Sequence, residues 1–229
     1  MALLGRAALA MWWDVAPDLR AAFEDWHAHE HFQERLGIPG FLRASRWTSA
    51  ESGDGFFVMY ELQDYDVLAS APYAARLDAP TPWSTRMMPH HRNMVRSQCR
   101  VLESQGAVTA RHAVTVRLSP AAGKAESLQL ALGELARSVW MRPGLVGLHL
   151  LRHETPPLAA TTEQMIRGNG DGVADWVLVA CGYDALALRA LADAELAETG
   201  LRALGAAPGT ERHLYGLAYS ATPADVGRG

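Results

Sequence analysis

The spacing of apolar and polar residues predicts a regular series of strands and helices in the first half of the chain. Strands are expected where apolar residues alternate with polar ones or form short runs, at 7–14, 41–48, 56–62 and 94–104. A first helix begins at Pro17, with Asp18 in its first turn, and runs to about Gly37, because proline and acidic residues favour a helix start and glycine a helix end. A second helix is expected at 65–77, interrupted near Pro72, and a stiff loop at 79–83.

The second half of the chain repeats this order of elements. Its predicted elements are a strand at 112–118, a helix at 122–141, strands at 145–153 and 174–182, a helix at 184–204 and a strand at 212–220. Pro39-Gly40 and Pro143-Gly144 each separate a helix from a strand, about half a chain length apart. The pattern indicates a duplicated α+β module whose two sheets can face each other and enclose a pocket. Residues 155–172 are an insertion in the second module, and their polar, glycine-rich composition favours a mobile or lid-like loop.

Composition and charge narrow the class of partner. A net charge of −4, with arginines scattered along the chain, gives no basic patch for a nucleic acid. No apolar run approaches the roughly 20 residues of a membrane span, and the apolar residues 1–13 are better explained by a first strand than by a signal peptide. Cys99 and Cys181 lie inside strand-like runs and are expected to be buried, reduced thiols of a cytoplasmic protein. The chain has no phosphate-binding loop, dinucleotide fingerprint or nucleophile elbow, and we expect no cofactor.

The densest group of reactive side chains is His27-Ala28-His29-Glu30-His31. His27 and His31 are expected on the flank of the first helix, four residues apart, a spacing that zinc sites use. Because the further ligands of a metal site are not evident, we predict no metal here. Two interpretations remain open: ordinary exposed histidines, or general acid–base catalysis in which Glu30 orients His31 and raises its pKa modestly.

The last strand of the first module has one polar and one small apolar face. Val95, Ser97, Cys99 and Val101 are expected to pack under the helices. The opposite face is polar and is expected either to line a cavity or to contact solvent; it comprises Met94, Arg96, Gln98, Arg100 and Leu102.

Residues 7–102 resemble the EthD-like branch of the dimeric α/β-barrel (ferredoxin-like) superfamily. The residues that carry the resemblance are Trp26, Glu30-His31, Arg35-Leu36, Ile38-Pro39-Gly40-Phe41, Arg43, Tyr60-Glu61, Tyr73, Pro80-Thr81, Trp83 and Arg86. It implies an α+β fold of two ferredoxin-like modules, 1–106 and 107–222, followed by a tail at 223–229. Their antiparallel four-stranded sheets would face each other as an α/β barrel with the helices outside. The second half lacks an equivalent of Glu30-His31, so any site is expected to be asymmetric.

The superfamily includes cofactor-free monooxygenases, isomerases and cyclases, so the resemblance implies a small-molecule enzyme without fixing its reaction. We expect acid–base chemistry on a small apolar or aromatic organic molecule in the cavity between the sheets. The predicted catalytic residues are His31, Glu30, His27 and Arg86. The predicted substrate-binding residues are Arg43, Trp47, Met59, Trp83, Arg96 and His149. The alternatives are a non-catalytic ligand-binding protein and a haem- or metal-dependent oxygenase with His149 or His213 as axial ligand; a homodimer is possible.

Overall fold

Eight strands close into one antiparallel barrel in the part of the chain that the computed structural model describes, residues 3–51, 55–155, 161–168 and 170–226. The strands are β1 (Ala7–Asp14), β2 (Phe41–Ser49), β3 (Gly55–Leu62), β4 (Arg92–Gly106), β5 (His112–Leu118), β6 (Leu145–His153), β7 (Trp176–Gly182) and β8 (Glu211–Ala221). The first half contributes the order β4–β1–β3–β2 and the second half the same order, β8–β5–β7–β6. Pairing of β2 with β8 and of β4 with β6 joins the two sheets.

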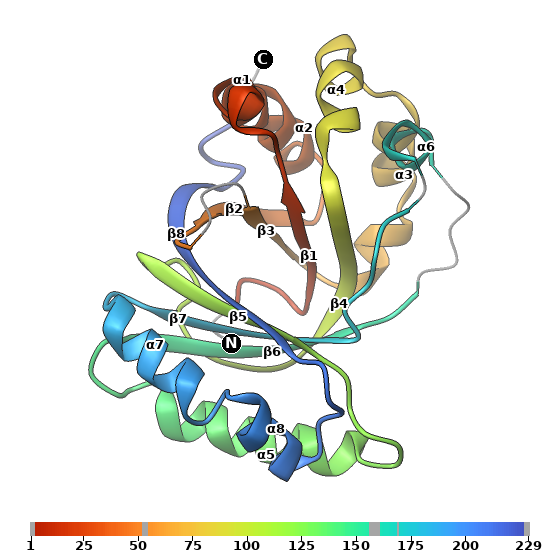
Figure 1. Cartoon of the computed structure of the whole chain (residues 1–229). Coiled ribbons are helices and arrows are strands. Elements are labelled where there is room, and N and C mark those ends of the chain that lie inside the picture. The colour runs from red at the N-terminus through yellow and green to blue at the C-terminus, as the bar shows by residue number, and fades with distance from the viewer. Residues whose placement is uncertain (1–2, 52–54, 156–160, 169, 227–229) are drawn as a thin grey trace.

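The helices lie outside the barrel, in two layers (Figure 1). They are α1 (Arg20–Trp26), α2 (Phe32–Leu36), α3 (Ala71–Asp78), α4 (Pro82–Met87), α5 (Ala125–Val139), α6 (Thr162–Arg167), α7 (Ala185–Asp193) and α8 (Glu198–Leu204). Shorter turns are the 3-10 turns η1 (Pro17–Leu19), η3 (Tyr65–Ala69) and η4 (Met88–His90), and a π-helical turn, η2 (His27–His31). The predicted fold class is therefore confirmed: an α+β protein whose ferredoxin-like sheets face each other, with helices outside.

The two Pro-Gly pairs occupy corresponding places in the two halves. Gly40 and Gly144 both adopt positive φ, +93° and +89°, a conformation that favours glycine. A Cβ atom at Gly40 would lie 2.4 Å from Val67, and one at Gly144 would lie 2.4 Å from Ala187. Gly40 therefore lets the start of β2 approach the turn η3, which follows β3. Gly144 lets the start of β6 approach helix α7, which follows β7.

The interior of the barrel is packed with side chains. Phe57 stacks on Trp12 and on Trp47, with ring centroids 5.1 Å apart in both pairs, and Met59 is buried beside them. The Trp12 indole Nε1 donates a hydrogen bond across the barrel to Thr115 Oγ1 (3.1 Å). These aromatic side chains fill the middle of the space between the two sheets, where the substrate cavity was predicted. A separate pocket is lined by Trp12 of the first half and by Arg117 and Tyr215 of the second, so the prediction of an inter-sheet cavity stays a prediction.

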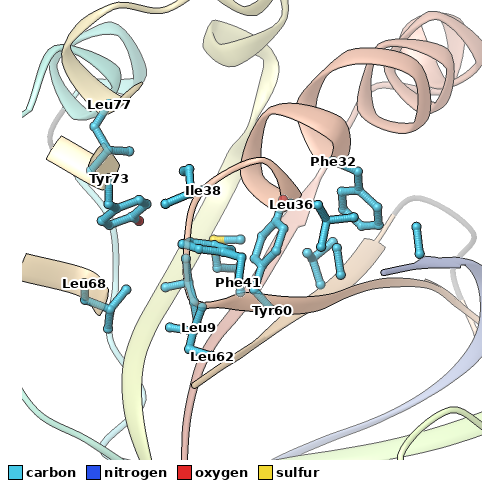
Figure 2. Packing of buried hydrophobic residues seen from close by; sticks show 14 of the residues in the cluster. Leu9, Phe32, Leu36, Ile38, Phe41, Tyr60, Leu62, Leu68, Tyr73 and Leu77 are labelled. Carbon is cyan, nitrogen blue, oxygen red and sulfur yellow. The ribbon is translucent and has the colours of Figure 1, made fainter. Parts of the chain in front are cut away.

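The other apolar clusters lie between the sheets and their helices. In the first half, Phe32 and Leu36 of α2 pack above Phe41 and Tyr60, which come from the outer face of the sheet (Figure 2). Phe41 and Tyr60 meet edge to face at 5.6 Å, a favourable aromatic geometry. A separate cluster of mainly aliphatic residues fills the equivalent layer of the second half, beneath α5, α7 and α8.

The element boundaries depart from the predictions at three places. The expected stiff loop at 79–83 leads directly into α4, which Thr81 caps by accepting a hydrogen bond from Ser84 N–H (3.0 Å). The single helix expected at 184–204 is divided into α7 and α8. The expected loop at 155–172 contains α6, with a capping box formed by Thr161 and Gln164. The run Ser52-Gly53-Asp54-Gly55 predicts a hairpin turn, which lies, apart from Gly55, outside the described residues. No helix in the described segments is long and apolar enough to cross a membrane.

We predict that Phe57→Ala destabilises the protein by about 3–5 kcal/mol, because it opens a cavity in the barrel interior that stacked rings cannot refill. Urea denaturation checks this value. Leu186→Ala is the control, since Leu186 is 75% exposed and its truncation should change stability by less than about 0.5 kcal/mol. Equal losses in both variants would contradict a packed barrel interior.

Candidate functional site

A pocket lies in the first half of the molecule, between the outer face of the sheet and the helical layer. Its empty volume is about 490 Å³, including the mouth that opens to solvent. It is lined by Leu9, Met11, Trp13, Trp26, His27, His31, Arg35, Tyr60, Tyr73, Leu77, Met88, His91, Met94, Arg96, Thr161, Glu163, Gln164 and Arg167. Figure 2 shows Tyr60 and Tyr73 in this layer, with Leu9 below and Leu77 above.

The π-helical turn η2 points two histidines into the molecule. His27 and His31 are 1% and 8% exposed, whereas the side chain of His29 is 68% exposed. Phe32 N–H bonds to the His27 carbonyl five residues earlier, so this turn contains one residue more than an α-helical turn. The regular 3.6-residue period predicted the reverse, with His29 inside and the other two histidines on the flank. That prediction was wrong because the π-turn changes the direction of the side chains.

Aromatic rings surround the buried histidines. His27 stacks on Phe23 at 5.3 Å, and the ring of His31 lies 4.6 Å from that of Trp26. The His27 and His31 rings are 5.4 Å apart and inclined by 30°, an arrangement of neighbouring rings rather than of two ligands converging on one ion. Within the described residues, no group of three or more potential ligands could hold a metal ion.

Burial keeps these histidines neutral. It lowers the pKa of His27 well below its usual value, and the nearby Arg46 guanidinium lowers it further. Burial and the Arg35 guanidinium do the same to His31. The pKa of His91 falls to about 4, again through burial, although its hydrogen bond with the Met88 carbonyl oxygen acts in the other direction. The modest increase in the His31 pKa that we predicted is therefore wrong.

Glu30 does not face His31. Its Oε1 accepts hydrogen bonds from Thr81 Oγ1 (2.6 Å), Trp26 Nε1 (3.1 Å) and Ser84 Oγ (3.3 Å). These contacts fix η2 against α4, so Glu30 holds the helices together. The carboxylate nearest to His31 belongs to Glu34, whose Oε2 lies 3.9 Å from His31 Nδ1, beyond hydrogen-bond distance. The predicted Glu30–His31 acid–base pair is wrong.

Helix α6, which belongs to the inserted segment of the second half, lies beside α3 of the first half (Figure 1). Its residues Glu163, Gln164 and Arg167 line the pocket. Arg35 of α2 and Glu163 of α6 form an ion pair in which both side chains are almost fully buried. The Arg35 Nη2 group donates to both carboxylate oxygens of Glu163, one of them at 2.6 Å. Thr162 N–H of α6 also donates to Asp78 Oδ1 at the end of α3 (3.1 Å). These contacts make α6 a wall of the pocket.

Polar atoms without partners converge on this pocket. Of twelve buried side-chain nitrogen and oxygen atoms that have no hydrogen-bond partner among the described residues, six belong to side chains that line it. They are Trp13 Nε1, His27 Nδ1, His31 Nδ1, Arg35 Nη1, Tyr60 OH and Arg167 Nε. Buried polar groups in folded proteins are nearly always paired, so this concentration is typical of a site that binds a polar ligand or water.

Strand β4 reaches the pocket with its polar face. Met94 and Arg96 line the pocket, and the Arg96 Nη2 group donates to the Tyr73 hydroxyl (2.9 Å). Val95 and Cys99, expected under the helices, instead face the barrel interior. The two faces were thus assigned in reverse, although the prediction that polar residues of this strand line a cavity places Arg96 correctly.

The remaining predicted site residues do not lie in this pocket. Trp47 and Met59 belong to the packed barrel interior, because alternate side chains of a strand face opposite sides of the sheet and these two face inward. Arg43 is paired with the buried Glu61 (3.5 Å) and bonds to Thr109. On α4, Arg86 is exposed, and Trp83 packs against the core without lining the pocket.

His149 is enclosed at another place. Its Nδ1 bonds to Ser104 Oγ (2.9 Å) and its Nε2 to the Ala107 carbonyl oxygen (3.3 Å). With both ring nitrogens engaged, His149 is neither a pocket residue nor an available axial ligand. His213 is half-exposed beside Glu51 (3.7 Å) and lines no part of this pocket.

Several pocket residues were not predicted to have a role. Arg35, Tyr60 and Tyr73 stand in the sequence pattern of the resemblance, but the pattern assigned them no contact. Glu163 and Arg167 lie in the insertion, one helical turn apart, and this spacing and the Thr161–Gln164 capping box are local signals of α6. Arg35 and Glu163 are 128 residues apart in the sequence. The periodicity of apolar residues predicts local elements and cannot predict a contact between residues so far apart.

Comparisons with known proteins place this fold among the ferredoxin-like α/β barrels. A protein of Fusobacterium nucleatum provisionally named a monooxygenase superposes with a TM-score of 0.62 at 10% identity, over 96% of this chain and 95% of that one. A Lactobacillus acidophilus protein with the same provisional name gives 0.61 at 9% identity, over 96% and 97%. An anthrone oxidase-like protein gives 0.61 at 12% identity, over 98% and 97%. No protein-family model and no curated sequence matches the chain.

We predict that acid destabilises this protein through its buried histidines. Below about pH 6.5 a histidine in the unfolded chain binds a proton, whereas the buried ring in the folded protein stays neutral. The free energy of unfolding therefore decreases as the pH is lowered, and for His91 this decrease continues to about pH 4. Each histidine contributes at most about 1.4 kcal/mol per pH unit. Urea denaturation between about pH 7 and about pH 5 should show a smaller loss in His27→Phe. His29→Gln should keep the wild-type loss, and an unchanged loss in His27→Phe contradicts the prediction.

We also predict that Glu163→Gln loosens α6. The substitution leaves the buried Arg35 charge without its carboxylate, and breaking one partner of a buried pair costs about 3–5 kcal/mol. Hydrogen exchange of the α6 amides should accelerate while the barrel strands keep their protection. The control is Glu195→Gln, which breaks the more exposed pair with Arg142 and should cost less than about 1 kcal/mol. Unchanged exchange in α6 would show that the ion pair does not hold it.

Proposed function

We propose that this protein is a small-molecule enzyme of the ferredoxin-like α/β-barrel type, acting by proton transfer in the pocket between the sheet and the helices. The observation that carries the proposal is one pocket lined by six side chains with unpartnered polar atoms and by aromatic and apolar residues. Ligand sites combine such apolar walls with a few polar groups that fix orientation. The names of the structural neighbours agree with an enzyme, and a cofactor-independent monooxygenase, isomerase or cyclase is the reaction class that we favour.

His31 is the proposed base. As a neutral imidazole, it can accept a proton from an acidic C–H group of the substrate; the C–H bond breaks and its electron pair remains on the substrate as an enolate. Nearby Arg35 and the Tyr60 hydroxyl can stabilise the enolate oxygen. Return of the proton at another carbon gives an isomerase. Reaction of an activated CH₂ group with O₂ gives a carbonyl and water, with the substrate as the reductant, and corresponds to a monooxygenase.

A non-catalytic binding protein is the second candidate, and one observation favours it. Glu30, which was expected to orient His31, is engaged with α4, and the Glu34 carboxylate is 3.9 Å away, so no group positions the proposed base by a hydrogen bond. In this case the same pocket would bind the same class of small organic molecule without turnover.

Three finer assignments accompany the proposal. The EthD-like branch is supported by the sequence pattern from Trp26 to Arg86, and tandem duplication by the matching strand order and the two Pro-Gly pairs. A cytoplasmic location is supported by the two buried free cysteines. For the haem alternative, His149 has both ring nitrogens engaged, whereas His213 lies away from the proposed pocket and lines two others.

The test is a panel of small aromatic ketones and phenols with an acidic C–H group, with anthrone included because of the anthrone oxidase-like neighbour. Deuterium exchange in D₂O and O₂-dependent oxidation are followed by NMR and absorbance. We expect His31→Gln to lower the rate by about 10²–10⁴-fold, with His29→Gln, an exposed histidine of the same turn, as the matched control. Equal rates in wild type and His31→Gln remove His31 from the mechanism. Binding without exchange or oxidation favours the non-catalytic candidate.

A further inference from the structure

The three guanidinium groups of the pocket differ in how their charge is compensated. Arg35 is paired with Glu163, and Arg167 with Asp171 (2.9 Å). Arg96 has no carboxylate partner among the described residues and is held by neutral groups. Its Nη2 donates to the Tyr73 hydroxyl. With the Gln98 amide oriented to satisfy its hydrogen bonds, the Gln98 amide oxygen accepts from Arg96 Nη2 at 3.2 Å and from Arg96 Nη1 at 3.3 Å. These partners fix the guanidinium in place and leave its positive charge uncompensated.

The unpartnered atoms of the pocket are mainly donors. The Trp13 indole, the second nitrogen of Arg35 and the Nε of Arg167 carry N–H groups that can only donate. Tyr60 is 1% exposed, and burial raises its pKa, so its hydroxyl keeps its proton and can donate too. The buried histidines are neutral and add no charge. The ligand must therefore supply acceptors, and a negative charge for Arg96.

The apolar part of the lining limits the size of the ligand. Met11, Leu77, Met88 and Met94 form these walls, and methionine side chains adapt to planar organic molecules. The empty volume of about 490 Å³ includes the open mouth, so the enclosed part favours a small ligand.

We propose that the pocket binds a small organic monoanion, a carboxylate or phenolate carried on an apolar body, and that Arg96 is the residue that binds its anionic group. This inference rests on the proposed function and specifies its substrate class. A charge-assisted hydrogen bond to a guanidinium is stronger than a neutral one, so a neutral isostere of the ligand should bind about 10- to 100-fold more weakly. An anion-binding role for Arg96 also explains why its anchors are a hydroxyl and an amide rather than a carboxylate.

The test compares benzoate with its neutral isostere benzamide by isothermal titration calorimetry. Wild-type protein should prefer benzoate by about 10- to 100-fold. Arg96→Gln should abolish this preference while retaining benzamide binding, and Arg96→Lys should keep part of it. The matched control is Arg92→Gln, the same substitution at an exposed arginine of the same strand, which should behave as wild type. Thermal melting verifies folding. Should Arg96→Gln not fold, Tyr73→Phe, which releases the guanidinium from its anchor, should weaken the preference.

The possible outcomes separate this inference from the proposed function. Equal affinities for benzoate and benzamide overturn the monoanion assignment and leave a small-molecule pocket in place. A benzoate preference that survives in Arg96→Gln overturns the role of Arg96. Binding of neither probe contradicts the pocket itself, and the inference fails together with the proposed function.

Discussion

Closure of two four-stranded sheets into one barrel determines where a ligand can bind in this protein. The inner faces of both sheets point at each other, and Trp12, Trp47 and Phe57 fill the space between them. An eight-stranded barrel is only wide enough for side chains or one small ligand, and here side chains occupy it. The outer faces remain, each covered by helices of its own half, and the second of these layers is packed with aliphatic residues. The pocket that contains the buried histidines lies in the first helical layer.

Within that layer, the π-helical turn and the helix of the insertion place the polar side chains. His27 and His31, four residues apart, share one face of a helix, and η2 turns that face to the inner side. Their neutral rings lie beside Arg35, whose charge Glu163 compensates from the second half of the chain. Buried imidazoles, a protonated tyrosine and fixed guanidinium groups therefore line one pocket.

The sequence was most informative where the physical signal is local. Strand periodicity and the two Pro-Gly pairs predicted the order of elements and two facing sheets, and the resemblance implied that these sheets are ferredoxin-like. The site was less predictable. His31 and Arg96 were recognised as candidates by residue type. A 3.6-residue periodicity does not predict a turn with i→i+5 hydrogen bonds. Alternation along a strand separates its two faces but does not show which face packs against the helices. Glu163 was missed because its partner, Arg35, is distant in sequence and close only after both halves have folded.

The position of α6 has a consequence for how such a molecule can change. A barrel built from two identical chains would carry every loop twice, and an insertion would alter two equivalent sites at once. In one chain, a segment between β6 and β7 covers a pocket that belongs to the other half. Changes in the length or composition of this segment can then alter which ligands the pocket admits, while the barrel strands and the histidine-bearing turn remain as they are. In a single chain, this segment can therefore change without a matching change in the other half.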